Sequence, residues 1–491
     1  MQFQQLWEPW TPYHSHTRSA VGPGLPELDF LFAVIHLPFS FPIDGAMTQR
    51  GLFALTTAAL LALATVRTIT APSVAEHPAL AQLASRWEPE LYAELGAVGP
   101  ALFDPTLRTP CVADKGGLVR CVPGAFLIGN WQSNSKGLGA AIGAHPDIKA
   151  VGNDRCFQTW TDDKGGRRWL RQTAPAGFDA RRQLLAALGC VTMLTFYPGF
   201  AGRFHKFWEK EYWPCKAKCV REKACEKTYY QREMWPCKQA ALAAHDRAAL
   251  LPTTASTPAL NVTPPYLLRA FYGARVKLVA CVRSPIDRLR HAFYTHPHYA
   301  KKYGQGAAGL HAYAMEQRAG WQACVQSYGA RRCAIHFEQL GAAQDGVFFH
   351  ADQLIRGMYA PFVADFLGAF PESQLLVVRT EDFIDKRQPL LNRIWRHLGV
   401  EPLDFENGSV PPALVRVQRR LPTDYWTWTK HKGPILPETT LVLKELYRPF
   451  NQELREMLAK EGTSCRGAAG DALAMNDAPP CDVFLWEPEV D

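Results

Sequence analysis

The chain has 491 residues, of which 47% are hydrophobic and 20% charged. This composition excludes a wholly disordered chain and supplies enough apolar surface for a large core. The net charge of +8 is spread along the chain without a long block of like charges. Nucleic-acid binding therefore gains no support, and an anionic small molecule or glycan fits the charge as well as a surface without function does.

The first feature along the chain is an uncharged apolar run, 51–66, between Arg50 and Arg67. It is short for a membrane span, so we expect 51–67 to be either a signal anchor or a signal peptide. Met47 opens a short basic segment that suits such a signal. Residues 1–50 are therefore expected to be an N-terminal extension, either cytoplasmic or untranslated, and the membrane is a predicted partner through 51–67.

Thirteen cysteines are many for a cytosolic protein. Several lie close together in the sequence, which indicates disulfides and an oxidising compartment: Cys111 with Cys121, Cys215 with Cys219, Cys225 with Cys237, Cys324 with Cys333, and Cys465 with Cys481. The odd total leaves at least one free thiol. Cys281 lies inside an apolar run, where a buried thiol is expected.

Residues 68–123 are expected to form a stem that ends in a small cysteine-closed loop. Three strand-then-helix units follow it: a strand at 122–129 with a helix at 138–145, a strand at 276–282 with a helix from Asp287, and a strand at 374–379 with a helix at 390–398. Strands that alternate with helices predict a parallel sheet covered on both faces, which is an α/β fold. We place the catalytic domain at 124–460 and a C-terminal tail at 461–491.

An insertion at 204–239 is dense in Trp, Tyr, Lys, Glu and Cys. A zinc knuckle and a disulfide-tied lid are both open interpretations. The spacing of its cysteines matches no standard zinc finger, so disulfides are favoured and no metal is expected.

Four separated segments, taken together and in order, resemble the sulfotransferases that use 3′-phosphoadenosine 5′-phosphosulfate (PAPS), especially the Golgi branch that modifies heparan and chondroitin sulfate. The segments are 126–147, 282–294, 354–383 and 430–454. The resemblance implies a P-loop-like three-layer sandwich, with a central parallel sheet flanked by helices. It also implies a carbohydrate or proteoglycan-like acceptor, PAPS as co-substrate without a metal, and a lumenal catalytic domain in the Golgi or secretory-pathway membrane.

The first segment resembles the family's loop around the 5′-phosphosulfate, where backbone N–H groups and a helix N-terminus surround the anion. The resemblance makes Ser133, Asn134, Ser135, Lys136 and Gly137 candidate cofactor ligands. Gln132 falls where the family has its catalytic Lys, and Asn134 where it has a Gly. Lys136 lies four positions further on, which is one helical turn if the loop enters the helix early, and it is the candidate substitute cation. Gln132 and Lys136 are therefore both assigned to the catalytic step.

The second segment resembles the family's 3′-phosphate site. Arg283 matches its phosphate-binding Arg, since a guanidinium gives bidentate contacts with phosphate. His291 takes the place of its Ser and can also donate a hydrogen bond. The late basic loop adds Lys430, Lys432 and Gly433 as candidate contacts. Read without the resemblance, Lys430 to Gly433 is simply a polar turn.

Relatives that sulfate glycosaminoglycans carry a Glu shortly after the first segment, and counting in register places Asp154 there. The resemblance therefore makes Asp154 the candidate base for in-line transfer, ahead of Asp162, Asp163 and His205.

We expect a sulfotransferase with a carbohydrate acceptor. The alternative is an inactive relative that binds a nucleotide or a sulfated glycan, and Gln132 separates the two. A kinase of related fold is disfavoured because no Gly-x-x-x-x-Gly-Lys-Ser/Thr loop occurs. Of the two glycosylation sequons at Asn261 and Asn407, the one at Asn407 is the more credible, because Pro264 follows the first.

Overall fold

The computed structural model describes residues 103–113, 119–152, 156, 177–195, 211, 213–222, 237, 240, 243–244, 250–251, 260–261, 263–273, 275–340, 342–403, 411–419, 433–461, 464–465 and 478–486. The segment 51–67, the stem before residue 103, the sequon at Asn407 and most of the insertion 204–239 lie outside these residues. Among the helices within them, none has both the length and the apolar character needed to cross a bilayer.

The centre of the fold is a sheet of five parallel strands, in the order β4-β5-β3-β8-β9. Their bounds are Ala125–Leu127 (β3), Ile148–Val151 (β4), Leu184–Ala187 (β5), Lys277–Val282 (β8) and Leu375–Arg379 (β9). From β3 in the middle the chain goes to β4 at one edge, returns to β5 between β4 and β3, and then crosses to the other side for β8 and β9. The expected parallel α/β sheet is confirmed.

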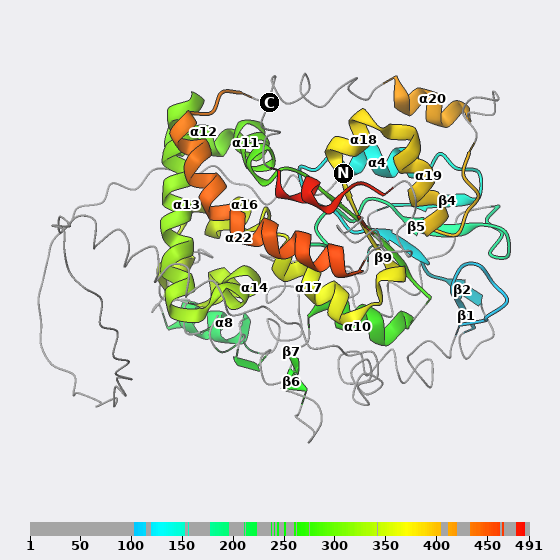
Figure 1. Ribbon diagram of the computed structural model, residues 1–491. Helices are drawn as coiled ribbons and strands as arrows, with labels where there is room; N and C mark the ends of the chain where they lie inside the picture. Colours follow the sequence, from blue (N-terminus) through cyan, green and yellow to red (C-terminus); the bar gives the residue numbers. More distant parts are fainter. Residues whose placement is uncertain are drawn as a thin grey trace, which may run out of the picture. The chain divides into compact units, whose positions relative to one another are not determined.

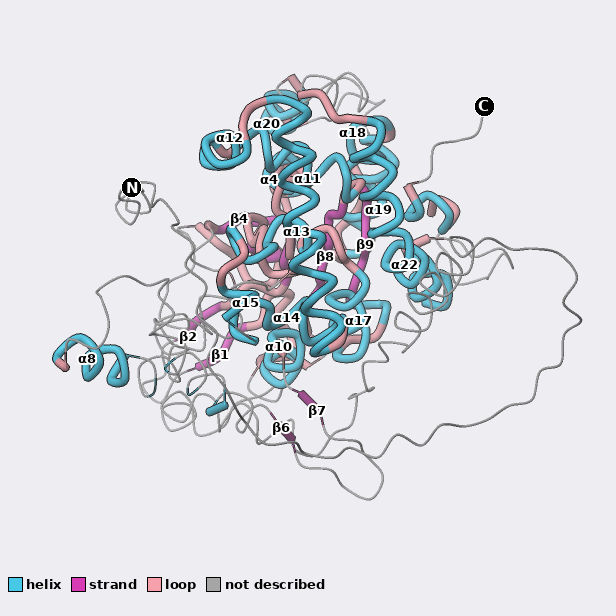
Figure 2. The backbone as a smooth tube through the Cα atoms, turned by 90° about the vertical axis from the view of Figure 1, so that its left-hand side faces the viewer, coloured by secondary structure: helices cyan, strands magenta, loops and turns pink. Residues whose placement is uncertain are grey.

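Strand alternation explains why helices cover both faces. Phe126 points to one face, where it joins a cluster with Leu278 and Val377, while Leu127 points to the other, with Val279. Because successive side chains on a strand point in opposite directions and nearly all of these are apolar, each face needs its own layer of helices. The three-layer arrangement is visible in Figures 1 and 2.

The layer that contains Phe126 is built from the larger helices. Its members are α10 (Pro264–Tyr272), α11 (Pro285–Thr295), α12 (Pro297–Tyr303), α13 (Gly306–Tyr328), α14 (Ala330–Leu340), α17 (Ala360–Ala369) and α22 (Pro437–Glu461). The opposite layer contains α4 (Ser135–Ile142), α18 (Thr380–Asp385), α19 (Arg387–His397) and α20 (Pro412–Gln418).

The described residues also contain shorter elements. They are α8 (Trp213–Arg221), α15 (Ala342–Asp345), α16 (Asp352–Ile355), the 3₁₀ turns η6 (Phe348–Ala351), η7 (Glu372–Gln374) and η8 (Cys481–Leu485), and the paired short strands β6 (Leu250–Leu251) and β7 (Leu260–Asn261).

The helices begin earlier than the sequence pattern predicted. The helix after β3 starts at Ser135 rather than at 138, because the residues before the apolar run already have helical geometry. The helix after β8 starts at Pro285, and the Ser284 hydroxyl accepts a hydrogen bond from the Asp287 N–H at its first turn. Proline at the first helical position and a serine cap are ordinary start signals, and they define this helix start better than the apolar periodicity does.

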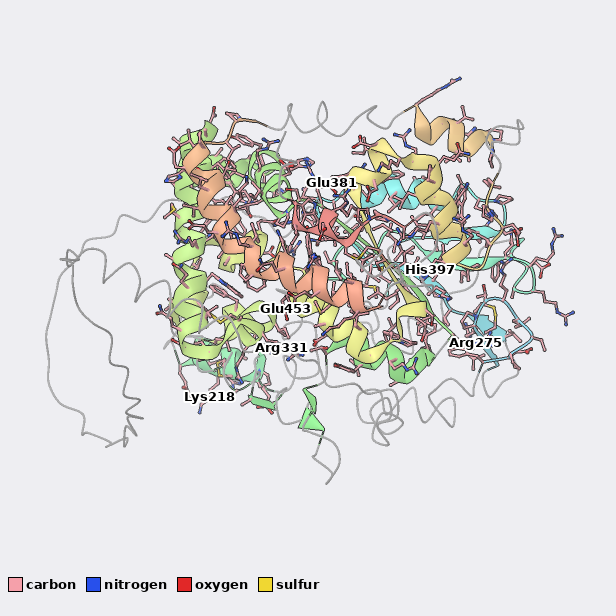
Figure 3. All side chains as sticks on the ribbon, viewed as in Figure 1. Lys218, Arg275, Arg331, Glu381, His397 and Glu453 are labelled. Carbon is pink, nitrogen blue, oxygen red and sulfur yellow. A yellow bond between two sulfur atoms is a disulfide. The ribbon has the colours of Figure 1, made fainter. Side chains whose placement is uncertain are left out.

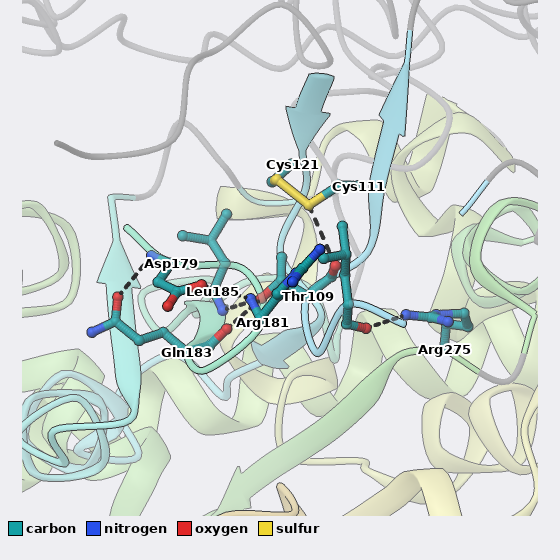
Figure 4. Close-up of a disulfide and its surroundings, with 9 residues drawn as sticks. Thr109, Cys111, Cys121, Asp179, Arg181, Gln183, Leu185 and Arg275 are labelled. Atoms are coloured by element: carbon teal, nitrogen blue, oxygen red, sulfur yellow. Dashed lines mark hydrogen bonds between the residues drawn. A yellow bond between two sulfur atoms is a disulfide. The ribbon is translucent and has the colours of Figure 1, made fainter. Parts of the chain in front are cut away.

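The cysteine-closed loop is docked on the sheet rather than standing apart from it. A hairpin of β1 (Cys111–Ala113) and β2 (Val119–Cys121) is closed by the Cys111–Cys121 disulfide. The Thr109 hydroxyl accepts from the N–H of Leu185 in β5 and donates to the carbonyl of Gln183 (Figure 4). The loop therefore extends the α/β domain at the β5 side.

The described cysteines form five disulfides, which confirms the expectation of disulfide bonding. They join Cys111 to Cys121, Cys156 to Cys190, Cys215 to Cys237, Cys324 to Cys333 and Cys465 to Cys481. The bond between Cys215 and Cys237 ties the two ends of the insertion, a connection that proximity in sequence did not indicate. Cys281 is free and fully buried, and burial raises the pKa of its thiol to about 12, so the thiol stays protonated.

The C-terminal segment is packed into the domain. Cys465, Cys481 and Phe484 are buried in the core, and the Ser464 hydroxyl accepts from the Val377 N–H of β9. The Arg379 guanidinium also donates to the carbonyl of Val483. Described residues beyond 460, within the expected tail, thus help to hold the edge strand of the sheet.

Candidate functional site

The sheet has a topological switch point between the neighbouring strands β3 and β8. The connection after β3 runs toward the β4 edge and the connection after β8 runs toward the β9 edge, so the two connections diverge at the carboxyl ends of these strands. Ligands bind in the crevice that forms at such a switch point in open α/β sheets. The loop 128–134 follows β3, and Arg283 follows β8, so the two predicted halves of the site meet here.

Asn130 anchors the loop after β3 from several sides. Its N–H donates to the carbonyl of Cys281 in β8 at 2.5 Å, and its amide nitrogen donates to the carbonyl of Arg356 at 2.7 Å. Its side-chain oxygen accepts from the Thr195 hydroxyl at 2.9 Å. Ser135 donates to its carbonyl at 2.9 Å. These bonds tie the loop to β8, to the segment at Arg356 and to Thr195, and no motif in the sequence singled out Asn130.

The loop also has unusual backbone geometry. Gln132 and Asn134 have φ values of 64° and 51°, in the left-handed region. Asn is one of the few non-glycine residues that adopts this region readily, which explains how Asn134 stands where the resembling family has a Gly. Strained backbone of this kind concentrates at functional sites, where the surroundings enforce it.

Two polar atoms of the loop are buried without a partner among the described residues: the Ser133 hydroxyl oxygen and the Asn134 amide nitrogen. Buried polar groups are nearly always satisfied, so an orphaned pair needs an explanation. The first turn of α4 adds to this, because it has no side-chain cap and no acidic residue in it. Its free N–H groups and the positive end of the helix dipole make the position suitable for an anion.

Lys136 lies in that first turn with its side chain exposed. The sequence interpretation set it one helical turn from Gln132. Gln132 precedes the helix, however, so the two are related by the loop and not by a helical turn. Gly137 follows in the same turn. Gln132 itself is half-buried, and its carbonyl accepts from the Arg283 guanidinium at 3.3 Å.

Arg283 is completely buried at the end of β8. Its Nη1 also contacts Nδ1 of His291, a residue of α11, at 3.0 Å. Because a guanidinium can only donate, Nδ1 of His291 must accept, which places the ring proton on Nε2. The His291 ring therefore lies beside the Arg283 guanidinium, and its role as a phosphate ligand stays a prediction.

The carbonyl and N–H of Arg283 are held by Tyr359, whose hydroxyl donates to that carbonyl at 2.7 Å. Glu381 approaches from α18 (Figure 3): its carboxylate accepts from the Ser284 N–H at 2.8 Å and from the Trp486 indole N–H at 3.1 Å. Burial raises the pKa of Glu381, while Arg379 opposes that shift. The hydroxyl of Thr380 donates to the carbonyl of Ser133 at 2.7 Å and thereby joins α18 to the loop.

Of the other predicted site residues, the structure describes some and leaves others outside the described residues. Gly433 lies against α11: a Cβ there would stand 2.5 Å from the Tyr294 ring, and its φ is 103°, so only glycine fits. Asp154, Lys430 and Lys432 fall outside the described residues. Arg288, one turn into α11, is fully buried and bonded to Gln353, while Arg290 pairs with Asp287.

The described residues contain no group of three or more His, Cys, Asp or Glu side chains placed to hold a metal ion. The site is instead an arrangement of hydroxyl, amide, guanidinium and backbone N–H donors. Such a set suits a ligand with two anionic groups, one near Ser133 and Asn134 and one near Arg283.

No protein-family model matches the chain. Over 201 residues it is 26% identical to carbohydrate sulfotransferase 15 of Homo sapiens, and the match covers 40% of this chain and 33% of the human protein. The Mus musculus protein matches to the same extent. A 134-residue match to carbohydrate sulfotransferase 15 of Nototodarus sloanii is 23% identical and covers 27% of this chain and 77% of that protein. The chain thus spans about a third of the length of its mammalian relatives.

Among solved structures, a sulfotransferase from Alicyclobacillus acidocaldarius aligns with a TM-score of 0.33 and 15% identity, over 68% of this chain and 95% of that chain. The sequence matches support a carbohydrate sulfotransferase-like family, as the ordered segments predicted.

Proposed function

We propose that this carbohydrate sulfotransferase-like chain transfers the sulfuryl group of PAPS to a hydroxyl of a carbohydrate acceptor. The observation that carries the proposal is the meeting of two anion-binding halves at the switch point of the sheet. One half contains the orphaned Ser133 hydroxyl and Asn134 amide, and the other contains buried Arg283 with His291. Their separation on neighbouring strands suits a nucleotide with phosphate at both ends.

The residues present fit PAPS, with one exception. Ser133, Asn134 and the first turn of α4 would hold the phosphosulfate, and Arg283, His291 and Gly433 would hold the 3′-phosphate, joined by Lys430 and Lys432. When bound, PAPS supplies the activated sulfuryl group. The exception is Gln132, which gives a neutral amide where the family has a cation. Lys136, exposed in the next turn, is the proposed substitute for that charge.

Transfer requires an in-line approach of the acceptor hydroxyl and a base that takes its proton. Asp154 is the proposed base, from its register in the sequence. The five disulfides support a place in the oxidising secretory pathway. We propose a Golgi membrane location with a lumenal domain, anchored through 51–67.

A second function rests on Gln132. Without the loop cation, the chain would bind the nucleotide or a sulfated glycan but transfer nothing. The two proposals are separated by incubating the chain with sulfur-labelled PAPS and a panel of glycans, for wild type and Gln132→Lys.

Label in a glycan with the wild type supports the enzyme. Label only with Gln132→Lys rejects transfer and supports the binding protein. If neither protein transfers label and the wild type is stabilised against melting neither by adenosine 3′,5′-bisphosphate nor by a sulfated glycan, both proposals are wrong.

A further inference from the structure

Beside the proposed sulfuryl-transfer loop is a column of aromatic rings that the nucleotide site does not use. Trp131, adjacent to Gln132, is stacked with His296 at a centroid distance of 6.5 Å and an interplanar angle of 12°. His296 in turn is stacked with His298 at 5.3 Å and 18°. His298 then meets Phe349 at 4.3 Å. Four rings from three separate segments therefore extend away from the transfer loop.

Three rings of the column, those of Trp131, His296 and His298, are only partly covered by the described residues. All three residues are half-buried. Among the described residues, no side chain or backbone group is hydrogen-bonded to the Trp131 indole N–H or to the ring nitrogens of His296. A half-exposed aromatic face with free polar atoms at its edge matches the composition of small-ligand sites.

The backbone on both sides of the column is strained. Five non-glycine residues among those described have positive φ: Gln132, Asn134, Phe349, Ala351 and Trp486. Gln132 and Asn134 follow Trp131 in the loop. Phe349 and Ala351 belong to η6 and its junction with α16, where Phe349 ends the column. Strain of this kind persists only where the surroundings enforce it, and it concentrates at ligand sites.

The charge at the column is close to zero. Burial lowers the pKa of His296, and burial followed by the effect of His296 lowers the pKa of His298 to about 4, so both rings are neutral near pH 7. The charged groups that face His296 are Arg356 and Asp352, and these form an ion pair with each other. The described charged groups that face His296 thus neutralise each other and offer no net positive charge to an acidic sugar.

We propose that Trp131 and His296 form the acceptor subsite, in which an uncharged sugar ring lies against the indole face and is hydrogen-bonded by the His296 imidazole. The weakly positive C–H groups on one face of a sugar ring are attracted to the negative face of an indole. The subsite rests on the proposed function, and it presents a hydroxyl of that ring to the loop at Gln132. These two residues make and break no bond. In the proposed transfer, a bond would form between the sulfur and the acceptor oxygen while the bond from the sulfur to the 5′-phosphate oxygen of PAPS breaks. Adenosine 3′,5′-bisphosphate would leave, and the hydroxyl proton would go to the base.

The test compares acceptor binding and turnover for wild type, Trp131→Phe, Trp131→Ala and His296→Ala, with Tyr328→Ala as an aromatic control at the far end of α13. Neutral and uronic-acid oligosaccharides are the two acceptor series. Acceptor binding is measured by calorimetry in the presence of adenosine 3′,5′-bisphosphate, so that it does not depend on turnover. The melting shift caused by that nucleotide reports folding and the integrity of the nucleotide site.

Loss of the stacking face in Trp131→Ala is expected to weaken binding of the neutral acceptor and raise its KM about tenfold, with kcat changed less. Trp131→Phe is expected to lie between Trp131→Ala and wild type, and Tyr328→Ala to match wild type. The nucleotide melting shift should be retained throughout.

Neutral-acceptor binding that is unchanged in both Trp131→Ala and His296→Ala overturns the subsite and leaves the proposed function standing. Preferential binding of the uronic-acid series at pH 7 overturns the assignment of an uncharged ring. A wild type that binds acceptor in a Trp131-dependent way but transfers no sulfate overturns the proposed transfer alone and supports the subsite.

Discussion

Replacing Arg283 by Lys tests the nucleotide site where the structure constrains it best. The guanidinium is completely buried, and it reaches the Gln132 carbonyl at 3.3 Å and His291 Nδ1 at 3.0 Å. Lysine keeps the charge but loses the planar fork. A hydrogen bond to a charged group contributes about 1.5–3 kcal/mol, so loss of one phosphate contact and of the alignment of His291 corresponds to roughly 10- to 150-fold weaker nucleotide binding.

Calorimetric titration of adenosine 3′,5′-bisphosphate at fixed salt measures this change. Arg290→Lys is the matched control, because Arg290 lies on α11, which begins two residues after Arg283, and pairs with Asp287 at 3.3 Å. It keeps the charge that pairs with Asp287, so it is expected to bind the nucleotide within about twofold of wild type. Melting of the nucleotide-free proteins checks that both variants fold. If folded Arg283→Lys binds as tightly as wild type, the 3′-phosphate is not held by Arg283 and the reasoning is refuted.

Two further predictions concern stability. Burial lowers the pKa of His397 (labelled in Figure 3) to about 3, and its Nε2 lies 3.1 Å from the Leu278 carbonyl. As pH falls below about 6.5, the unfolded chain takes up a proton that the folded state refuses, so stability should fall by about 1.4 kcal/mol per pH unit from this residue. In urea unfolding at pH 7 and pH 5, His397→Gln should lose about 2 kcal/mol less than wild type; equal losses would contradict the assignment. The Cys465–Cys481 bond closes a loop with a sequence separation of 16, and its removal in Cys465→Ala/Cys481→Ala should cost about 3 kcal/mol in the same assay. An unchanged urea midpoint at neutral pH would show that the packing of Phe484 alone holds this segment.

Local sequence patterns were sufficient for the parts of the fold that depend on local physics. Apolar runs such as 276–282 specified the buried parallel strands, because a strand covered on both faces has no polar side to display. The number and spacing of cysteines indicated disulfides. The ordered motifs identified the loop at Gln132 and the buried Arg283, since each motif combines a strand end with the side chains that follow it.

The sequence could not supply the contacts between segments that are distant along the chain. The burial of Arg288, the anchoring of the loop by Asn130 and the bond from Trp486 to Glu381 each join residues that no periodicity relates. Helix starts were missed for a different reason. Caps and proline define them, whereas hydrophobic periodicity shows only where the buried face begins.

The sequence by itself therefore determined an α/β chain with disulfides, and it determined that the loop carries Gln132 where a cation was expected. Only the tertiary structure decided that this loop is next to Arg283, because strand order is set by how the layers pack and not by the strands themselves. It also decided that Trp131 faces His296, a pairing of an ordinary loop tryptophan with the C-cap residue of α11. Side chains far apart in the chain become a site only when the fold places them at the same edge of the sheet.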